Sequence, residues 1–398
     1  MNILLFTAHF PAFDCPERSY ATPFLYNYAK EWVKTGANVT VVHFTRVYPK
    51  VFNVLARMVS SCGIKRFDRY MIDPSIQTEK TYDYNGVHII RIPFAKNIPH
   101  GVVGKNVIRK IIKSLDKYLS GYTPDVMIGD FVDPVLRVAI YYQKKFGVNY
   151  GQIVHNSDFD LLNKKEIAVA VPKIDYWLFR SKENRNQMYN LAADLSKKYA
   201  YFYSGIPENV LPQKPTFRKK ISNLLYVGAL YKSKGLSTIL EALSISTNQN
   251  LKLVVVGKGP DEAFFRGQVK DLRLTEKVTF IGPVSHDKVF TYMQESDALV
   301  LISHETFGMV YVEAMSQGCI PIGVINDGID GVVRNGVNGF LVPIDDSKAL
   351  AQLFEEMAEM DTCFVEELSR EAFETGKNMT ENVLAENVLN NIVSGRFE

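Results

Sequence analysis

The stretch Glu305–Gly318, with the sequence ETFGMVYVEAMSQG, decides how the rest of the chain is interpreted. It follows the apolar run Ala298–Ser303, which is typical of a buried parallel strand. Apolar residues then recur at helical spacing up to Gly318, where a glycine favours a helix end. The pattern predicts a strand, a loop with the carboxylate of Glu305, and a short helix that carries a second carboxylate, Glu313.

The two glutamates flank a predicted helix N-terminus, whose free backbone N–H groups attract anions. Gly308 would let a ligand approach the backbone closely. If the whole segment were helical, Glu305 and Glu313 would lie up to about 12 Å apart, so they could bind hydroxyl groups at opposite ends of one ligand. A nucleotide-sugar, with a diphosphate between a sugar and a ribose, has that layout. A solvated Glu305 and a capping Glu313 are the alternative.

The length and composition are those of a globular protein with several domains. The chain has 398 residues, of which 46% are hydrophobic and 22% charged, which suits two or three domains with sizeable cores. Four scattered cysteines without metal-like spacing favour a reducing compartment. No apolar run approaches the ~20 residues that span a bilayer, and Met1–Phe6 is more typical of a first strand than of a signal peptide. We therefore expect a cytoplasmic protein.

Charge is unevenly distributed, although the formal net charge is only +3. Residues 1–205 carry 28 Lys and Arg against 17 Asp and Glu, and the remainder carries 18 against 26. The first half is therefore expected to meet something anionic. The basic amphipathic stretch Lys105–Leu119 would suit anionic lipid, with peripheral contact at the inner face of the membrane. A helix with one face on a sheet and its lysines in water is the alternative. We expect no nucleic-acid partner.

Strand-like and helix-like segments alternate along both halves, which predicts an α/β protein with two mostly parallel, doubly wound sheets. The predicted strands are Asn2–Thr7, Asn38–Phe44, Val87–Pro93, Asp125–Asp130, Tyr150–His155, Tyr176–Ser181, Ala200–Tyr203, Leu224–Ala229, Leu251–Val256, Val278–Ile281, Ala298–Ser303, Ile320–Gly323 and Phe340–Val342. The predicted helices are Tyr20–Thr35, Lys105–Ser120, Pro134–Phe146, Lys182–Lys197, Gly235–Ser246, Pro260–Leu272, Lys288–Glu295, Phe307–Gln317 and Lys348–Glu359, followed by a wholly helical tail over Val365–Val393. The less regular segment Tyr48–Gln77 suggests an insertion.

Glu305 and Glu313, with seven residues between them, resemble the E-x7-E signature of the retaining GT-B glycosyltransferases of family 4. Further stretches resemble blocks of that family and follow in its order. They are Tyr226–Leu230 with Lys234 and Gly235, Val256–Pro260, Val278–Val284 and Asn335–Val342. The resemblance covers about residues 224–345 and implies a GT-B fold, in which two doubly wound, Rossmann-like domains face each other across a cleft.

The resemblance also implies roles for the matching residues. Lys234 would pair with the donor diphosphate, Glu305 would bind a hydroxyl of the donor sugar, Glu313 would bind the ribose hydroxyls, and Val284 would lie near the base. The remaining donor-binding positions are Gly228, Gly257, Gly259, Phe307, Gly308, Met309 and Val310. A solvated lysine at a helix start, and turns that need glycine for their backbone alone, are the structural alternatives.

In the first half, Ile153–Asn156 resembles the block whose histidine faces the donor sugar. His155 therefore joins Glu305 and Lys234 as a predicted catalytic residue, with a structural histidine at a strand end as the alternative. The sequence departs from the family in two places. Ala229 stands where the family has an arginine, and the family's glycine-rich loop after the first strand is absent. Lys232, Arg18 or another basic residue would substitute for the arginine; weaker stabilisation of the leaving group is the alternative.

Two further carboxylate patterns have simpler explanations. Asp158 and Asp160 imitate the metal-binding DxD motif of the other glycosyltransferase fold. Two aspartates at this spacing are common by chance, and we predict neither a metal nor a cofactor. Asp130 and Asp133 bracket a strand end and are expected to cap the next helix.

We thus predict an N-terminal acceptor-side domain over 1–205, a linker over 206–222, a nucleotide-sugar domain over 223–375, and a C-terminal helix over 376–398 that packs back on the first domain. The predicted reaction transfers a sugar, with retention and without a metal, from a UDP-sugar to an acceptor hydroxyl. A GDP-sugar is the other donor candidate. The acceptor would be a glycan, a glycolipid or a polyprenyl-linked intermediate of cell-surface polysaccharide synthesis. A nucleotide-sugar epimerase and a non-catalytic partner subunit remain alternatives.

Overall fold

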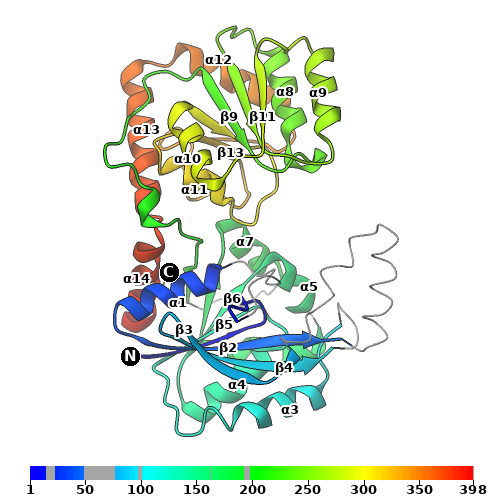
Figure 1. The fold of residues 1–398 in the computed structure, drawn as a ribbon, viewed down its shortest axis with the longest axis vertical. Helices are drawn as coiled ribbons and strands as arrows, with labels where there is room; N and C mark the ends of the chain where they lie inside the picture. Colours follow the sequence, from blue (N-terminus) through cyan, green and yellow to red (C-terminus); the bar gives the residue numbers. More distant parts are fainter. Residues whose placement is uncertain (15–22, 49–76, 97–100, 163, 192–197, 398) are drawn as a thin grey trace. The chain divides into compact units, whose positions relative to one another are not determined.

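The computed structural model of the protein describes residues 1–14, 23–48, 77–96, 101–162, 164–191 and 198–397. The chain forms two compact units (Figure 1). Unit 1 comprises Met1–Phe179, Gln187–Phe202 and Ala385–Glu398, and unit 2 comprises Arg180–Asn186 and Tyr203–Leu384. The stretch 206–222, which we predicted as a linker, thus belongs to unit 2. The predicted insertion, Tyr48–Gln77, lies outside the described residues except at its two ends.

Unit 1 is built on an eight-stranded sheet with the order β3-β4-β2-β1-β5-β6-β7-β8. The strands are β1 (Asn2–Thr7), β2 (Asn38–Val47), β3 (Lys80–Tyr84), β4 (Val87–Ala95), β5 (Val126–Asp130), β6 (Tyr150–Val154), β7 (Tyr176–Phe179) and β8 (Tyr199–Tyr201). All pairings are parallel except the edge pairing of β3 with β4. The buried apolar runs of the central strands fit a sheet that is covered on both faces.

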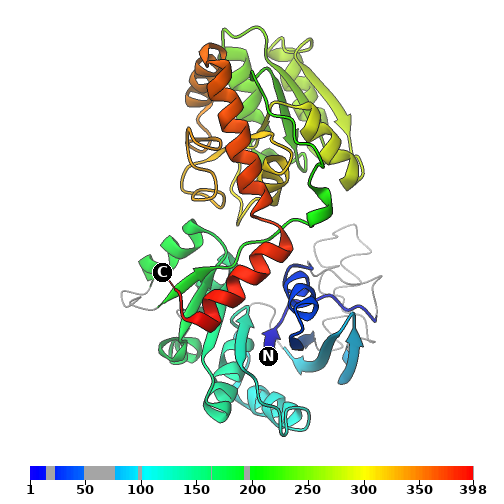
Figure 2. The same ribbon diagram turned by 90° about the vertical axis from the view of Figure 1, so that its left-hand side faces the viewer.

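Helices lie on both faces of the unit 1 sheet. The helices of unit 1 are α1 (Phe24–Lys34), α3 (Lys105–Leu115), α4 (Val135–Phe146), α5 (Phe159–Leu162) and α6 (Lys165–Ala168), together with the later parts of α7 (Lys182–Leu191) and α14 (Glu381–Ser394), both of which begin in unit 2. The main core packs α3 and α4 against the sheet through residues such as Phe6, Phe44 and Tyr142. α1 lies beside α14 (Figures 1 and 2), and the indole of Trp32 donates to the carbonyl of Ala385 at 2.8 Å.

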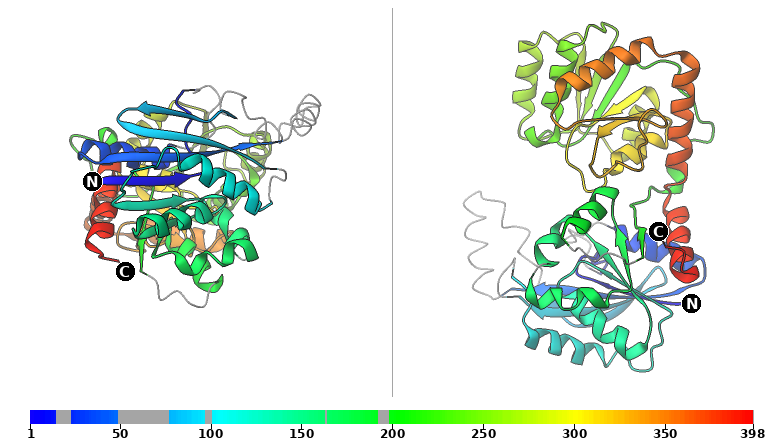
Figure 3. Two further views of the ribbon diagram at one scale, coloured as in Figure 1. Left: turned by 90° about the horizontal axis from the view of Figure 1, so that it is seen from below. Right: turned by 180° about the vertical axis from the view of Figure 1, so that it is seen from behind.

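Unit 2 contains a wholly parallel six-stranded sheet with the order β11-β10-β9-β12-β13-β14. The strands are β9 (Asn223–Val227), β10 (Lys252–Val256), β11 (Val278–Gly282), β12 (Ala298–Val300), β13 (Ile320–Val324) and β14 (Phe340–Val342). The helices are α8 (Leu236–Ile245), α9 (Glu262–Asp271), α10 (His286–Glu295), α11 (Met309–Met315), α12 (Ser347–Glu359) and α13 (Thr362–Lys377). α8 packs with α9 and α12, and α11 packs with α10 and α13 (Figure 3), which gives a helical layer on each face of the sheet.

Arg218, in the predicted linker, is a buried cation that makes no ion pair with any described residue. Its guanidinium instead donates to the main-chain carbonyls of Thr216, Met293, Gln294, Ser296 and Gln317 at 2.6–3.0 Å. The carbonyls from 293 to 317 lie at the ends of α10 and α11, where intrahelical donors run out. The arginine therefore joins this stretch firmly to unit 2.

The two parallel-dominated sheets confirm the predicted α/β fold class. One predicted element is wrong, because the C-terminal tail is not a single helix. α13 ends at Lys377 and α14 begins at Glu381, since the intervening backbone pairs with Ile206, whose N–H donates to Met379 and whose carbonyl accepts from Glu381. In the described part of the chain, no helix combines the length and the apolar character required to cross a membrane.

Candidate active site

The strand order of unit 2 reverses at β9. β10 and β11 lie on one side of β9, whereas β12, β13 and β14 lie on the other. The crevice outside the carboxyl ends of the strands at such a reversal is the usual ligand site of an open α/β sheet. The loop after β9 carries Lys234 and the loop after β12 carries Glu305, so these two predicted residues flank the reversal point.

Lys234 and Glu305 form an ion pair. Nζ of Lys234 lies 2.5 Å from Oε1 of Glu305, and the side chains are 32% and 23% exposed. The hydroxyl of Ser303 donates to the same carboxylate oxygen at 2.9 Å. The pair is therefore held in place but stays open to solvent, and an anionic ligand could compete with Glu305 for the lysine.

Asp327 fixes the loop that carries Glu305. Its Oδ1 accepts hydrogen bonds from the N–H groups of Glu305 (2.8 Å) and Gly328 (2.6 Å), and its Oδ2 lies 2.5 Å from Nδ1 of His304. Sequence reasoning missed this residue. The available signal was its place directly after the apolar strand β13, because the carboxyl end of a central parallel strand is where ligand sites form.

The helix after Glu305 is shorter than predicted. α11 begins at Met309, so Glu305 lies outside the helix and the separation estimated for a fully helical segment does not apply. The cause is Gly308, whose φ of +85° breaks the helical backbone. Within the described structure, the N–H groups of Phe307, Gly308, Met309 and Val310 have no hydrogen-bond acceptor. The turn thus presents four free donors directly after Glu305 in the chain.

Glu313 lies in the second turn of α11, where its Oε1 is 3.0 Å from Nε2 of His286. The Glu313 side chain is 14% exposed, whereas His286 is 61% exposed. We predicted that α10 begins at Lys288, but it begins at His286, and the role of His286 beside Glu313 was missed. Val284, in the loop that leads into α10, is half-buried.

The glycines at the ends of β9 and β10 bring two backbone segments into contact. A Cβ at Gly257 would lie 1.9 Å from the carbonyl oxygen of Gly228, and one at Gly259 would lie 2.3 Å from that of Leu230. Chain packing alone therefore requires glycine at these two positions, as the structural alternative stated.

The missing family arginine has no obvious replacement in the described structure. Ala229 is exposed at the end of β9. The ammonium of Lys232 lies 4.1 Å from the ring centre of Phe264, and its N–H donates to Asp261, so this lysine is oriented toward α9. The other candidate, Arg18, lies outside the described residues.

His155 follows β6 in unit 1 and is held by a buried carboxylate. Its Nε2 lies 2.6 Å from Oδ1 of Asp130, while Thr7 donates to Oδ2 of Asp130 at 2.8 Å. The imidazole also stacks on Phe131 with ring centres 4.1 Å apart, and Phe131 has an unusual φ of +64°. These residues lie at the reversal point of the unit 1 sheet, where β1 and β5 are neighbours.

Asp158 and Asp133, two further aspartates of unit 1, have structural partners. Asp158 is 2% exposed and accepts from the N–H groups of Val132 and His155. Burial raises the pKa of Asp158 to about 6, although His155 lowers it.

The prediction that Asp130 or Asp133 caps α4 is wrong. Pro134 precedes α4 without a side-chain cap, because Asp133 is engaged by the N–H of Val103 and by Arg137. Among the described residues, no group of three His, Cys, Asp or Glu side chains could hold a metal ion.

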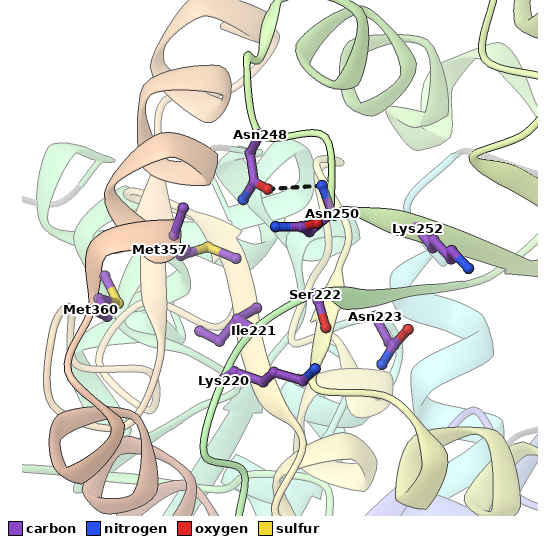
Figure 4. Close-up of a pocket in the computed structure, with 10 residues that line it drawn as sticks. Lys220, Ile221, Ser222, Asn223, Asn248, Asn250, Lys252, Met357 and Met360 are labelled. Atoms are coloured by element: carbon purple, nitrogen blue, oxygen red, sulfur yellow. Dashed lines mark hydrogen bonds between the residues drawn. The ribbon is translucent and has the colours of Figure 1, made fainter.

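A hollow of about 510 Å³ lies at the opposite edge of the unit 2 sheet (Figure 4). It is lined by residues at the amino ends of β9 and β10, including Asn223 and Lys252, and by Met357 of α12. None of the predicted site residues lines it. The candidate site is therefore the carboxyl edge, where the ion pair and the free N–H groups lie.

Comparisons with known proteins show which family and which fold the chain resembles. Residues 208–379 match the family model described as "Glycosyl transferases group 1". The N-acetyl-alpha-D-glucosaminyl L-malate synthase of Bacillus anthracis is 26% identical over 311 residues, which cover 77% of this chain and 74% of that protein. The lipopolysaccharide outer core galactosyltransferase WaaB superposes with a TM-score of 0.67 at 18% identity, over 100% of both chains. Anabaena HepE, solved with UDP and glucose, gives 0.60 at 16% identity, over 98% of this chain and 99% of that chain.

The fold, with its two parallel-dominated Rossmann-like sheets, is that of the GT-B glycosyltransferases. Residues 208–379 match the group 1 glycosyltransferases, which confirms the resemblance found in the sequence for this part of the chain.

Proposed function

We propose that this glycosyltransferase takes its sugar from a UDP-sugar, transfers it with retention at the anomeric carbon, and holds the donor in unit 2. The observation that carries the proposal is the solvent-accessible Lys234–Glu305 pair beside four free backbone N–H groups at residues 307–310. A bound diphosphate would replace Glu305 as the ion-pair partner of Lys234 and would accept hydrogen bonds from the N–H groups. Glu305 would then be free to accept a hydrogen bond from a hydroxyl of the donor sugar. Glu313, in the second turn of α11, would bind the ribose hydroxyls.

The proposed reaction breaks the bond between the anomeric carbon and the diphosphate oxygen and forms a bond from that carbon to the acceptor oxygen. The departing diphosphate carries the negative charge, which Lys234 and the N–H groups stabilise. The acceptor proton passes to the leaving phosphate oxygen, so no protein base is assigned. No step involves a metal ion, and transfer is therefore expected to persist in excess EDTA.

The relatives suggest which donors to test first. HepE was solved with UDP and with UDP-glucose, and the name of the Bacillus anthracis protein contains an N-acetylglucosaminyl group. We would screen UDP and GDP derivatives of glucose, galactose, mannose and N-acetylglucosamine by thermal shift with the full chain, then identify products by mass spectrometry. Stabilisation by UDP-sugars and a glycosylated acceptor would support the proposal. An epimerised free sugar formed without acceptor would support the epimerase instead.

The acceptor is proposed to be a glycan or a lipid-linked glycan in cell-surface polysaccharide synthesis, with contact at an anionic membrane. α3 presents exposed cations, among them Lys105, Arg109 and Lys113, while its apolar residues Ile108 and Ile111 are buried in unit 1. Membrane contact through α3 would therefore be electrostatic. Sedimentation with vesicles containing phosphatidylglycerol is expected at low salt and lost at high salt; no sedimentation at low salt would contradict this part.

A further inference from the structure

A group of three cations lies at the carboxyl edge of the unit 1 sheet, and we call it the basic cluster. Arg46 is near the end of β2, Lys96 directly follows β4, and Arg137 is in the first turn of α4. β2 and β4 are neighbours in the sheet, and the N–H of Lys96 donates to the carbonyl of Val47 at 3.0 Å. The topology thus brings these cations together from distant parts of the sequence.

Among the residues that the structure describes, one carboxylate forms ion pairs with the basic cluster. Asp133 lies 3.7 Å from Nζ of Lys96 and 2.6 Å from Nη2 of Arg137. The side chains of Lys96, Arg137 and Asp133 are 7%, 11% and 1% exposed. Arg46 forms no ion pair with any residue that the structure describes. Counting the described residues, three cations against one carboxylate leave two uncompensated positive charges in a place where Lys96 and Arg137 are largely buried, which is costly unless an anion binds there.

Unused hydrogen-bond donors point the same way. The Nε atoms of Arg46 and Arg137 are buried and have no acceptor among the described residues. Burial, followed by the charge of Arg46, lowers the pKa of Lys96, and Asp133 offsets this only in part. A bound dianion would accept from the orphaned donors and favour the charged lysine.

His9 links the basic cluster to the candidate catalytic His155 of the same unit, because it interacts electrostatically with both Arg46 and His155. His9 feels the charge of Arg46 as well as those of Asp130 and His155, and its pKa is lowered, chiefly by burial. None of these cations matches a position to which the family resemblance gives a donor role. The donor site proposed above lies entirely in unit 2, so the basic cluster is available for a different ligand.

We propose that Arg46, Lys96 and Arg137 bind a phosphate group of the acceptor, so that the acceptor is a phosphate ester or a diphosphate rather than a neutral sugar. Two excess positive charges match a phosphate dianion, and a guanidinium presents paired donors to phosphate oxygens. That the bound phosphate belongs to an acceptor rests on the proposed function. The binding of an anion at this site can be tested without it.

The first test measures the binding of inorganic phosphate to the full chain by calorimetry. Lys234→Ala is used as the background, so that the proposed donor site does not contribute. Saturable binding is expected, and Arg46→Gln or Lys96→Met should weaken it at least about tenfold. Lys144→Gln removes an exposed charge from the far end of α4 and should not change it. No saturable binding in the background protein, or equal binding in all variants, would overturn the site. Should Lys96→Met fail to fold, the half-buried Arg46 still provides the test.

The second test separates the sources of the phosphate. Labelled UDP-sugar is offered with monosaccharides, with the matching monosaccharide phosphates, and with a short-chain prenyl diphosphate sugar. Transfer to the phosphates identifies a soluble acceptor, and transfer to the prenyl diphosphate identifies a lipid-linked one. Preference for the neutral sugars would overturn the proposal. If UDP-sugars neither bind nor turn over, the proposed function fails while the phosphate titration still decides the anion site.

Discussion

The two units of the molecule place polar residues at the same position of the same kind of sheet but treat them differently. In unit 2, Lys234 and Glu305 neutralise each other in a half-exposed ion pair beside unused N–H groups. In unit 1, Asp130 is buried and shared between His155 and Thr7, and the nearby cations of the basic cluster outnumber their carboxylate.

This difference indicates two kinds of binding site. When a ligand enters the ion pair, the lysine exchanges its carboxylate partner for the anionic ligand. The charge of the lysine is therefore balanced both with and without the ligand. A cluster with excess charge is balanced only when the ligand is present. The first arrangement suits a donor whose products leave after every cycle, and the second suits selection of an acceptor by charge. The following predictions test this contrast, beginning with the largest expected effect.

Lys234→Ala should reduce transfer about 10²- to 10³-fold, because it removes the cation that stabilises the departing diphosphate. Steady-state kinetics with a UDP-sugar would measure the loss, and Glu305→Gln should cause a loss of similar size. Lys252→Ala, at the opposite edge of the same sheet, is the matched control and should retain activity. Full activity in the Lys234 variant would contradict the assignment of the donor site to unit 2.

Arg218→Ala should lower the free energy of unfolding of unit 2 by about 3 kcal/mol, since buried carbonyls lose their donor. Both tryptophans, Trp32 and Trp177, lie in unit 1. In urea, the far-UV circular dichroism transition of unit 2 should therefore move to lower concentration while the tryptophan fluorescence midpoint stays in place. Equal shifts of both signals would show that the two units do not unfold independently.

Asp130→Asn should reduce transfer about tenfold, because His155 loses its charged hydrogen-bond partner and therefore its orientation. UDP affinity, measured by calorimetry, should not change, since the proposed nucleotide contacts are in unit 2. Asp160→Asn, an exposed aspartate of α5, serves as the control. Weaker UDP binding in the Asp130 variant would contradict the assignment of the nucleotide to unit 2 alone.

His286→Gln should change UDP affinity only about two- to threefold, because an exposed hydrogen-bond partner of Glu313 contributes little. Lys288→Gln, on the same helix, should leave the affinity unchanged. A loss of tenfold or more in the His286 variant would mean that the imidazole contacts the nucleotide itself.

The sequence predicted most of the fold because the apolar runs of parallel strands are continuous. Asn2–Thr7 and Phe340–Val342 have the predicted bounds. It failed where contacts distant in sequence decide the outcome. β3 is polar and largely exposed, and it is a strand only through its pairing with β4. The break after Lys377 depends on Ile206, about 170 residues earlier in the chain.

The same limit applies to the candidate site. Lys234 and Glu305 each belong to a short motif that the sequence shows, and the structure brings the two side chains together. The supporting residues carry no such motif. Asp327 follows an apolar strand, but its contact with Glu305 can be predicted only once β13 is known to lie beside β12. The basic cluster can be predicted only once β2, β4 and α4 are known to share an edge. Side chains that position a site loop or are proposed to select the acceptor are therefore harder to predict from the sequence than those that are proposed to bind the donor.

The union of α1 and α14 in unit 1 has a consequence for how the protein is made. Trp32 reaches the carbonyl of Ala385, 353 residues later in the chain, so the ribosome must synthesise all of unit 2 before unit 1 can be completed. Unit 2, apart from Arg180–Asn186, is one unbroken segment from Tyr203 to Leu384, so its residues are synthesised before the part of α14 that completes unit 1. The unit that begins the chain is thus the one whose synthesis finishes last.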